Sequence, residues 1–152
     1  MSLNEAPMTA LTDAQCRSLR ALAALMIPAD PATSMPAADD DAIFADILAS
    51  LGRDASQVVA ALDALDALAG GRFGDLAPAA QAAAAARLQA AGGPMVLALT
   101  RAVAQSYYRD DRVMRAIGLE PRPPFPQGHA LEPNDWSLLD PVRARGPIWR
   151  EA

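Results

Sequence analysis

The densest group of reactive side chains in this sequence is the run YYRDDR, from Tyr107 to Arg112. A tyrosine held beside an arginine could act as a proton donor in a reaction. The alternative is structural: one ring packs inward, while an aspartate caps the next helical turn. We favour the structural interpretation, because the sequence brings no nucleophile, base and acid together.

Three further features could carry chemistry. His129 is the only histidine and Cys16 the only cysteine, too few for a usual zinc set. Cys16 falls on the apolar face of a predicted helix, so we expect a small buried hydrophobe and not a reactive thiol. The triplet of residues 39–41, all aspartate, suggests a metal site, but adjacent carboxylates on a helix point in different directions. We expect the triplet to favour a helix start.

Known catalytic motifs are missing from the sequence. No glycine-rich phosphate loop follows a strand, and no G-x-S-x-G elbow occurs. An enzyme would need an active site around Tyr107, Arg112 and Asp135, which nothing in the sequence assembles. We therefore predict that the chain is not an enzyme and holds no catalytic residue, metal or cofactor. A binding or assembly module is the better interpretation.

Composition and charge limit the classes of partner and of fold that we expect. The 152 residues carry a net charge of −5, which disfavours nucleic-acid binding. The longest aliphatic run, residues 21–27, is much too short to span a membrane. About half of the chain is apolar, and the abundance of Ala and Leu with few β-branched residues favours helix. One domain with a substantial core is expected for this length.

Helical spacing of apolar residues predicts an all-α fold, a small bundle of about five helices. The signals at the ends are a capping-box spacing between Thr12 and Gln15, prolines at Pro78 and Pro94, and glycine pairs after the third and fourth helices. A short turn or helix should follow before Gly118. The predicted helices cover residues 12–27, 38–51, 54–69, 78–91 and 94–107.

The character of the chain changes after Gly118. Residues 119–152 hold seven of the thirteen prolines and both tryptophans. The proline density predicts an extended arm without regular helix, which belongs to the same domain as the bundle of residues 1–118. The arm is also apolar and aromatic, and such a segment needs a surface to lie on. That surface is either its own bundle or another protein.

We expect the arm to carry the partner-binding residues. Trp and Arg are enriched among interface hot spots. Large apolar side chains are predicted to anchor in pockets of the partner, and arginines to bond carboxylates or carbonyls at the rim. The predicted partner-binding residues are Phe125, Trp136, Leu139, Arg143, Arg145, Trp149 and Arg150.

Residues 106–150 resemble the C-terminal signature of the gluconate 2-dehydrogenase subunit 3 family. The matching features are a Tyr-Tyr pair at 107–108, Asp110, Arg112 before a valine, Gly118, a proline-rich stretch, and Asp-Trp, Leu-Asp and Val-Arg-x-Arg segments. An opening helix that runs into Ile-Pro-Ala-Asp, residues 27–30, is also similar to the family. The glycine that commonly follows this segment in the family is absent here.

The resemblance implies a non-catalytic small subunit that binds, stabilises and helps to fold or export a larger enzyme. That partner would be a flavoprotein of the glucose-methanol-choline type, which holds FAD and oxidises a sugar or polyol. Some such complexes add a cytochrome c subunit. The compartment stays open: periplasmic if a twin-arginine signal preceded this start, cytoplasmic otherwise. The alternative is a stand-alone helical interaction or regulatory protein whose arm wraps back over its own helices.

Overall fold

The computed structural model describes residues 11–130 and 133–146. Within these ranges the chain forms seven α-helices, three short 3₁₀ helices and no strand, so the predicted all-α class is confirmed. None of the described helices has the length and apolar character needed to cross a membrane. The chain divides into two compact units, Met1–Pro121 and Arg122–Ala152, called here the bundle unit and the arm unit.

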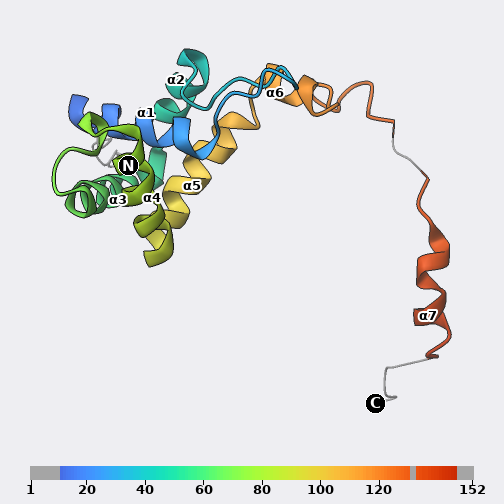
Figure 1. Ribbon diagram of the computed structural model, residues 1–152. Helices are drawn as coiled ribbons and strands as arrows, with labels where there is room; N and C mark the ends of the chain where they lie inside the picture. The colour runs from blue at the N-terminus through green and yellow to red at the C-terminus, as the bar shows by residue number, and fades with distance from the viewer. Residues whose placement is uncertain (1–10, 131–132, 147–152) are drawn as a thin grey trace, which may run out of the picture. The chain divides into compact units, whose positions relative to one another are not determined.

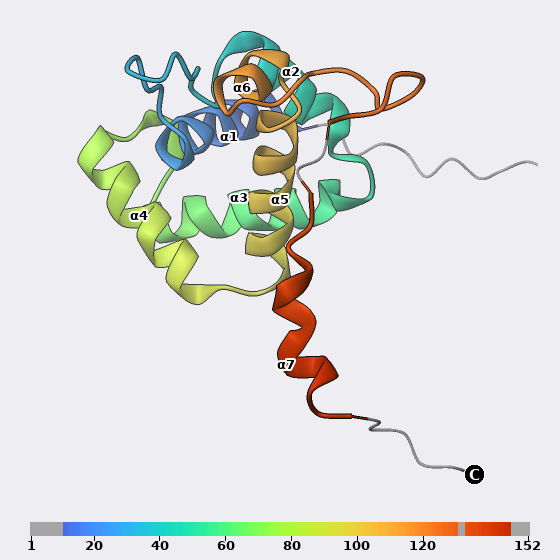
Figure 2. The same ribbon diagram turned by 90° about the vertical axis from the view of Figure 1, so that its right-hand side faces the viewer.

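The described part of the bundle unit, residues 11–121, contains six α-helices and two 3₁₀ turns. α3 packs against α4 and α5, α2 packs against α5, and α1 lies on α3 and on the η2 turn. Figures 1 and 2 show α5 crossing α3 and leading to α6. The elements are α1 (Asp13–Met26), α2 (Asp41–Ser50), η1 (Gly52–Asp54), α3 (Ala55–Ala69), η2 (Phe73–Asp75), α4 (Pro78–Ala91), α5 (Pro94–Tyr107) and α6 (Asp111–Ala116).

Most helix ends follow the local signals. The Thr12 hydroxyl accepts from the Gln15 amide, and the Gln15 side chain accepts from the Thr12 amide, which completes the predicted capping box. Pro78 and Pro94 begin α4 and α5, where a missing N–H costs nothing. Gly70 ends α3 in the left-handed conformation at φ 69°.

The predicted start of α2 was wrong, and that of α3 was right but without the expected capping bond. α2 begins at Asp41, later than the expected residue 38, because the Asp40 side chain is the cap and accepts from the Ala42 amide. Asp54 precedes α3 without a capping bond. Its carboxylate instead pairs with the Arg101 guanidinium at 2.6 Å, which ties the start of α3 to α5. A partner far away in the sequence thus replaced the local cap.

The core lies where helical faces meet. Aliphatic side chains from α1, α2, α3 and α5 are almost fully buried in it, among them Leu19, Ile43, Ile47, Val58, Leu62, Leu65 and Val103. Phe73, from the η2 turn, is also fully buried, although no helical spacing marks it. Gly74 lets this turn approach α1: a Cβ there would lie 3.1 Å from the Ser18 amide nitrogen.

Tyr107 is the largest fully buried side chain of the bundle unit, and its ring is 1% exposed. Its hydroxyl donates to the Pro36 carbonyl at 2.9 Å. The ring also meets Tyr108 edge to face, with 5.3 Å between centroids. The hydrogen bond from Tyr107 to Pro36 joins the end of α5 to the loop between α1 and α2. Burial is the main cause that raises the Tyr107 pKa, so the neutral donor form persists at physiological pH.

The arm unit is not wholly extended, and the prediction that its prolines prevent helix was wrong. A 3₁₀ turn, η3 (Trp136–Leu139), runs directly into a short helix, α7 (Asp140–Arg143). Pro141 occupies the first turn of α7, where no intrahelical partner for its nitrogen is required. The Asp135 side chain caps η3 by accepting from the Ser137 amide at 3.0 Å. Proline density therefore limited the helix without abolishing it.

We predict that Tyr107→Phe lowers the free energy of unfolding by about 1–2 kcal/mol, because the partly buried Pro36 carbonyl would lose its donor. Urea denaturation followed by circular dichroism measures this difference. Tyr108→Phe is the matched control, since Tyr108 is 55% exposed, and should change stability by less than about 0.5 kcal/mol. Equal effects of the two substitutions would contradict the assignment.

Candidate interaction site

The polar cluster at the start of α6 is an ion-pair network. Asp110 is the N-cap of α6 and accepts from the Arg112 amide at 2.8 Å. The Arg112 guanidinium bonds the Asp110 carboxylate at 2.9 Å and the Asp40 carboxylate at 2.7 Å. Asp40 is itself the N-cap of α2. One arginine therefore joins the first turns of two helices.

The network's electrostatics fit a structural role. Hydrogen bonding to Arg112 is the main cause that lowers the pKa of both Asp40 and Asp110. Both carboxylates are thus held ionised and paired, which disfavours their use as a general acid at neutral pH. The Tyr107 hydroxyl is likewise engaged, because it donates to the Pro36 carbonyl. These contacts favour the structural interpretation of the Tyr107–Arg112 run.

Gly118, the last residue of this motif, ends α6. Its φ is +82°, a region that favours glycine. The Gly118 amide donates to the Arg115 carbonyl at 3.0 Å, and the Leu119 amide donates to the Met114 carbonyl at 2.8 Å. This pair of bonds is a Schellman motif, so Gly118 terminates the helix by its backbone conformation.

The other candidate groups are also engaged. Asp41 pairs with Arg20 at 2.7 Å, and the Asp39 carbonyl accepts from the same guanidinium at 3.1 Å. Two of the three carboxylates of the triplet, those of Asp40 and Asp41, therefore pair with arginines of the protein itself. Among residues 11–130 and 133–146, no three acidic, histidine or cysteine side chains converge as a metal site requires. Burial raises the pKa of the Cys16 thiol, which lowers its thiolate fraction.

Sequence reasoning missed a second arginine network in the bundle unit. The Arg109 guanidinium bonds the Asp46 carboxylate and lies 2.6 Å from the Ser50 hydroxyl, both on α2. It also donates to the Ser106 hydroxyl at 3.3 Å. Asp46 and Ser50 lie 63 and 59 positions away from Arg109 in the sequence, so no local pattern signals them.

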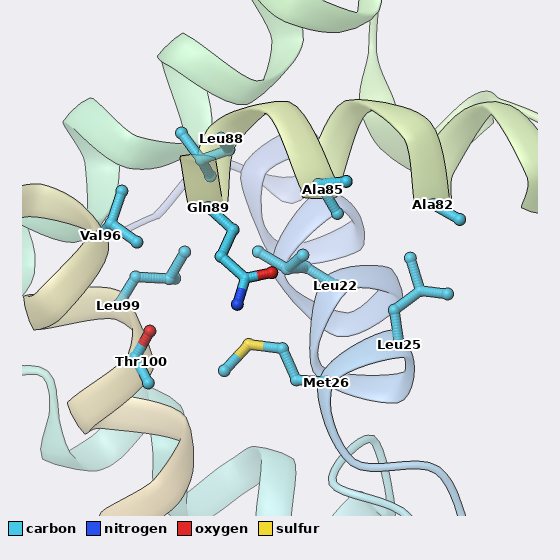
Figure 3. A pocket seen from close by; sticks show the side chains of 11 residues that line it. Leu22, Leu25, Met26, Ala82, Ala85, Leu88, Gln89, Val96, Leu99 and Thr100 are labelled. Atoms are coloured by element: carbon cyan, nitrogen blue, oxygen red, sulfur yellow. The ribbon is translucent and has the colours of Figure 1, made fainter. Parts of the chain in front are cut away.

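An apolar groove of about 450 Å³ opens between α1, α4 and α5. Figure 3 shows Leu22 and Met26 of α1 facing Leu99 of α5 across it, with Leu25 nearer to Ala82 of α4. Alanines of α4 line another part of the groove, and Gln89 and Thr100 are its polar members. No charged group lines it, so the groove offers packing area without a catalytic or ion-binding group.

The arm unit presents the strongest candidate for a binding surface. Trp136 is 62% exposed, Leu139 41% and Phe125 84%. Neither η3 nor α7 has a buried residue. A tryptophan left in contact with water loses the stabilisation that burial of its large apolar area would provide. Leu138 and Val142 are exposed on the same segment, and sequence reasoning did not include them among the site residues.

Arg143 and Arg145, the two predicted site arginines that the structure describes, differ in their ion pairs. Arg143 pairs with Asp140 three residues earlier at 2.9 Å. Arg145 pairs with no acid among the described residues, although its amide donates to the Val142 carbonyl at 3.2 Å. The predicted anchors Trp149 and Arg150 lie outside the described residues. The described part of the predicted site therefore comprises Phe125, Trp136, Leu139 and two arginines.

We predict that Asp110→Ala lowers the free energy of unfolding by about 1–2 kcal/mol, because α6 loses its cap and Arg112 loses one acceptor. Asp110→Asn is the matched control: its amide oxygen can still cap the helix, so most of the loss should be avoided. Thermal or urea unfolding of both variants measures the difference. If the two variants are equally unstable, the cap is not the stabilising contact.

A pH titration tests the Arg112 pairs. Because the pKa of Asp40 and of Asp110 is lowered from the ordinary 3.8, their pairing stabilises the fold above that pH and is lost as the pH falls below it. Arg112→Met should cost about 1 kcal/mol near pH 7, since all three groups are partly exposed. The stability gap to the parent chain should narrow on acidification below about pH 3.8. A gap that stays constant to the acid transition would disprove the pairing.

Comparison of the chain with models of protein families, with curated proteins and with solved structures finds no match. The likeness of residues 106–150 to a family therefore rests on the sequence motifs of that range alone. What that likeness implies about partners is a proposal, which the exposed surface of the arm unit can support.

Proposed function

We propose that this chain is a non-catalytic accessory subunit that binds and stabilises an FAD-dependent sugar or polyol dehydrogenase, and assists its folding or export. The observation that carries the proposal is the set of large apolar side chains that the arm unit leaves exposed. Phe125, Trp136 and Leu139 would anchor in pockets of the flavoprotein. FAD would belong to the partner, and this chain would bind no cofactor.

The difference in apolar burial between the two units of the chain supports a docking role. The bundle unit buries a continuous core of aliphatic side chains and Tyr107. The described part of the arm unit buries none of its large apolar residues. Exposed aromatic and aliphatic side chains gathered on one short segment are typical of protein-binding surfaces. A partner that covered them would gain hydrophobic free energy and hot-spot contacts.

The identity of the partner rests on the resemblance of residues 106–150. In that family the small subunit accompanies a flavoprotein of the glucose-methanol-choline type, and some complexes also contain a cytochrome c subunit. The residues shared with that signature in the bundle, among them Tyr107 and Arg112, hold the end of α5 and the start of α6. Their role here would be to support the fold from which the arm begins.

The non-catalytic part of the proposal rests on how the reactive side chains are engaged. The Tyr107 hydroxyl donates to a backbone carbonyl, and Arg112 is shared between two carboxylates. Asp135, the third residue that an active site would have needed, lies in the arm unit and accepts from Ser137. Each of these groups is accounted for by a structural contact.

The first experiment is a pull-down from the source cells with the chain tagged at its N-terminus, followed by a flavin absorbance scan. A yellow complex that contains a large flavoprotein, with dehydrogenase activity absent from the isolated small chain, is expected. A colourless chain without a flavoprotein under gentle conditions would refute the proposal. The result would then favour the stand-alone interaction or regulatory protein.

We predict that Trp136→Ala weakens the complex by about 2–4 kcal/mol, which is roughly a 30- to 700-fold rise in Kd. Titration of the flavoprotein with each chain, followed by calorimetry, measures the change. Leu97→Ala is a control of similar exposure, because Leu97 lies on α5 and is 64% exposed. An unchanged Kd for Trp136→Ala would remove this tryptophan from the interface.

A further inference from the structure

We propose that the flavoprotein recognises residues 135–146 as a preformed short helix that lies in an apolar groove. The contact face consists of Trp136, Leu139 and Arg143, and the groove carries carboxylates at the end that receives Arg143 and Arg145. This inference rests on the proposed function and defines the partner's surface. It replaces the extended arm expected from the prolines by a helix-in-groove mode of recognition.

Local bonds hold the segment in its helical form. At its start, the Asp135 carboxylate accepts from the Ser137 amide at 3.0 Å and from the Ser137 hydroxyl at 2.6 Å. At its end, the Gly146 amide donates to the Arg143 carbonyl at 3.2 Å, with Gly146 at φ +71°. All of these partners lie within the segment. A segment ordered by its own caps loses less conformational entropy on binding than an unstructured one.

Helical geometry defines two stripes on this segment. Side chains three apart align in a 3₁₀ turn, so Trp136 and Leu139 lie on one side of η3. Leu139 is four positions before Arg143 and is its neighbour across the turn. The second stripe contains Leu138 and Val142, which are also four positions apart.

Residue types distinguish the two stripes. The first combines a tryptophan and an arginine, the types most enriched among binding hot spots, on either side of Leu139. The second stripe holds only leucine and valine, which are under-represented among hot spots. We therefore assign the groove contact to the first stripe. Leu138, although 74% exposed, then lies at the edge of the contact or outside it.

The acidic and basic side chains of the segment are unevenly distributed along it, which favours one orientation in the groove. Its acids, Asp135 and Asp140, lie toward the N-terminal end, and each is bonded within the segment, to Ser137 and to Arg143. Arg143 and Arg145 lie at the C-terminal end, where no acid of the segment follows. A groove with carboxylates at this end would bond the forked guanidinium groups. The reverse orientation would place those carboxylates beside Asp135.

The neighbouring leucines provide the decisive test, because they differ in stripe and not in residue type. The flavoprotein is purified through its binding to the parent chain and is then separated from it. It is titrated with the full-length Leu139→Ala and Leu138→Ala chains. We expect Leu139→Ala to raise Kd tenfold or more, a larger effect than most interface residues show. Leu138→Ala should raise it less than about threefold. Circular dichroism melting of each variant verifies that the bundle is folded.

The cap provides a second test in the same titration. Asp135→Ala removes the acceptor of Ser137 and should raise Kd by roughly three- to tenfold through loss of the preformed helix. Asp135→Asn keeps a capping oxygen without the charge and should restore most of the affinity. A role of the Asp135 charge in direct contact would instead make both variants equally weak.

Each outcome separates this inference from the proposed function. If a flavoprotein binds but the two leucine variants have equal Kd values, the assigned face is wrong and the accessory role stands. Equal loss in both Asp135 variants likewise overturns the preformed helix alone. If no flavoprotein is recovered with the parent chain, the proposed function fails, and this inference fails with it.

Discussion

Burial of apolar side chains is the constraint on which the organisation of this chain depends. The bundle unit satisfies it internally: helical faces from α1, α2, α3 and α5 meet, and even the tyrosine at the end of α5 is buried. The arm unit is too short to build a comparable core. It can bond its own backbone through caps and turns, but Trp136, Leu138 and Leu139 remain exposed. This asymmetry is the physical basis of the docking role proposed above.

The residues that look most reactive in the sequence stabilise the bundle. Arg112 bonds the N-caps of α2 and α6, and Tyr107 bonds the loop that precedes α2. These contacts hold the end of α5 and the start of α6 against segments from the first third of the chain. Residues of this kind can therefore recur in a family signature because the fold requires them. In this chain, the chemistry of binding would lie in the arm.

Local signals predicted much of the fold. Capping residues, prolines in first turns and terminal glycines located the ends of α1, α4 and α5, because each acts within a few residues of itself. The same local chemistry formed η3 and α7 in the arm, but the count of prolines obscured it: Pro141 lies in a first turn and Asp135 in a capping position. Position within the turn, and not proline frequency, decided the helix.

The sequence by itself determined the all-α class, the five long helices of the bundle and the concentration of aromatic and arginine residues after Gly118, since these depend on residue type and short spacing. Only the tertiary structure decided that Asp54 pairs with Arg101 and not with its own helix, that Phe73 enters the core from a turn, and that Arg112 bridges two caps. These contacts join residues dozens of positions apart. Their free energy depends on how packed helices bring the partners together, which periodicity along one helix does not encode.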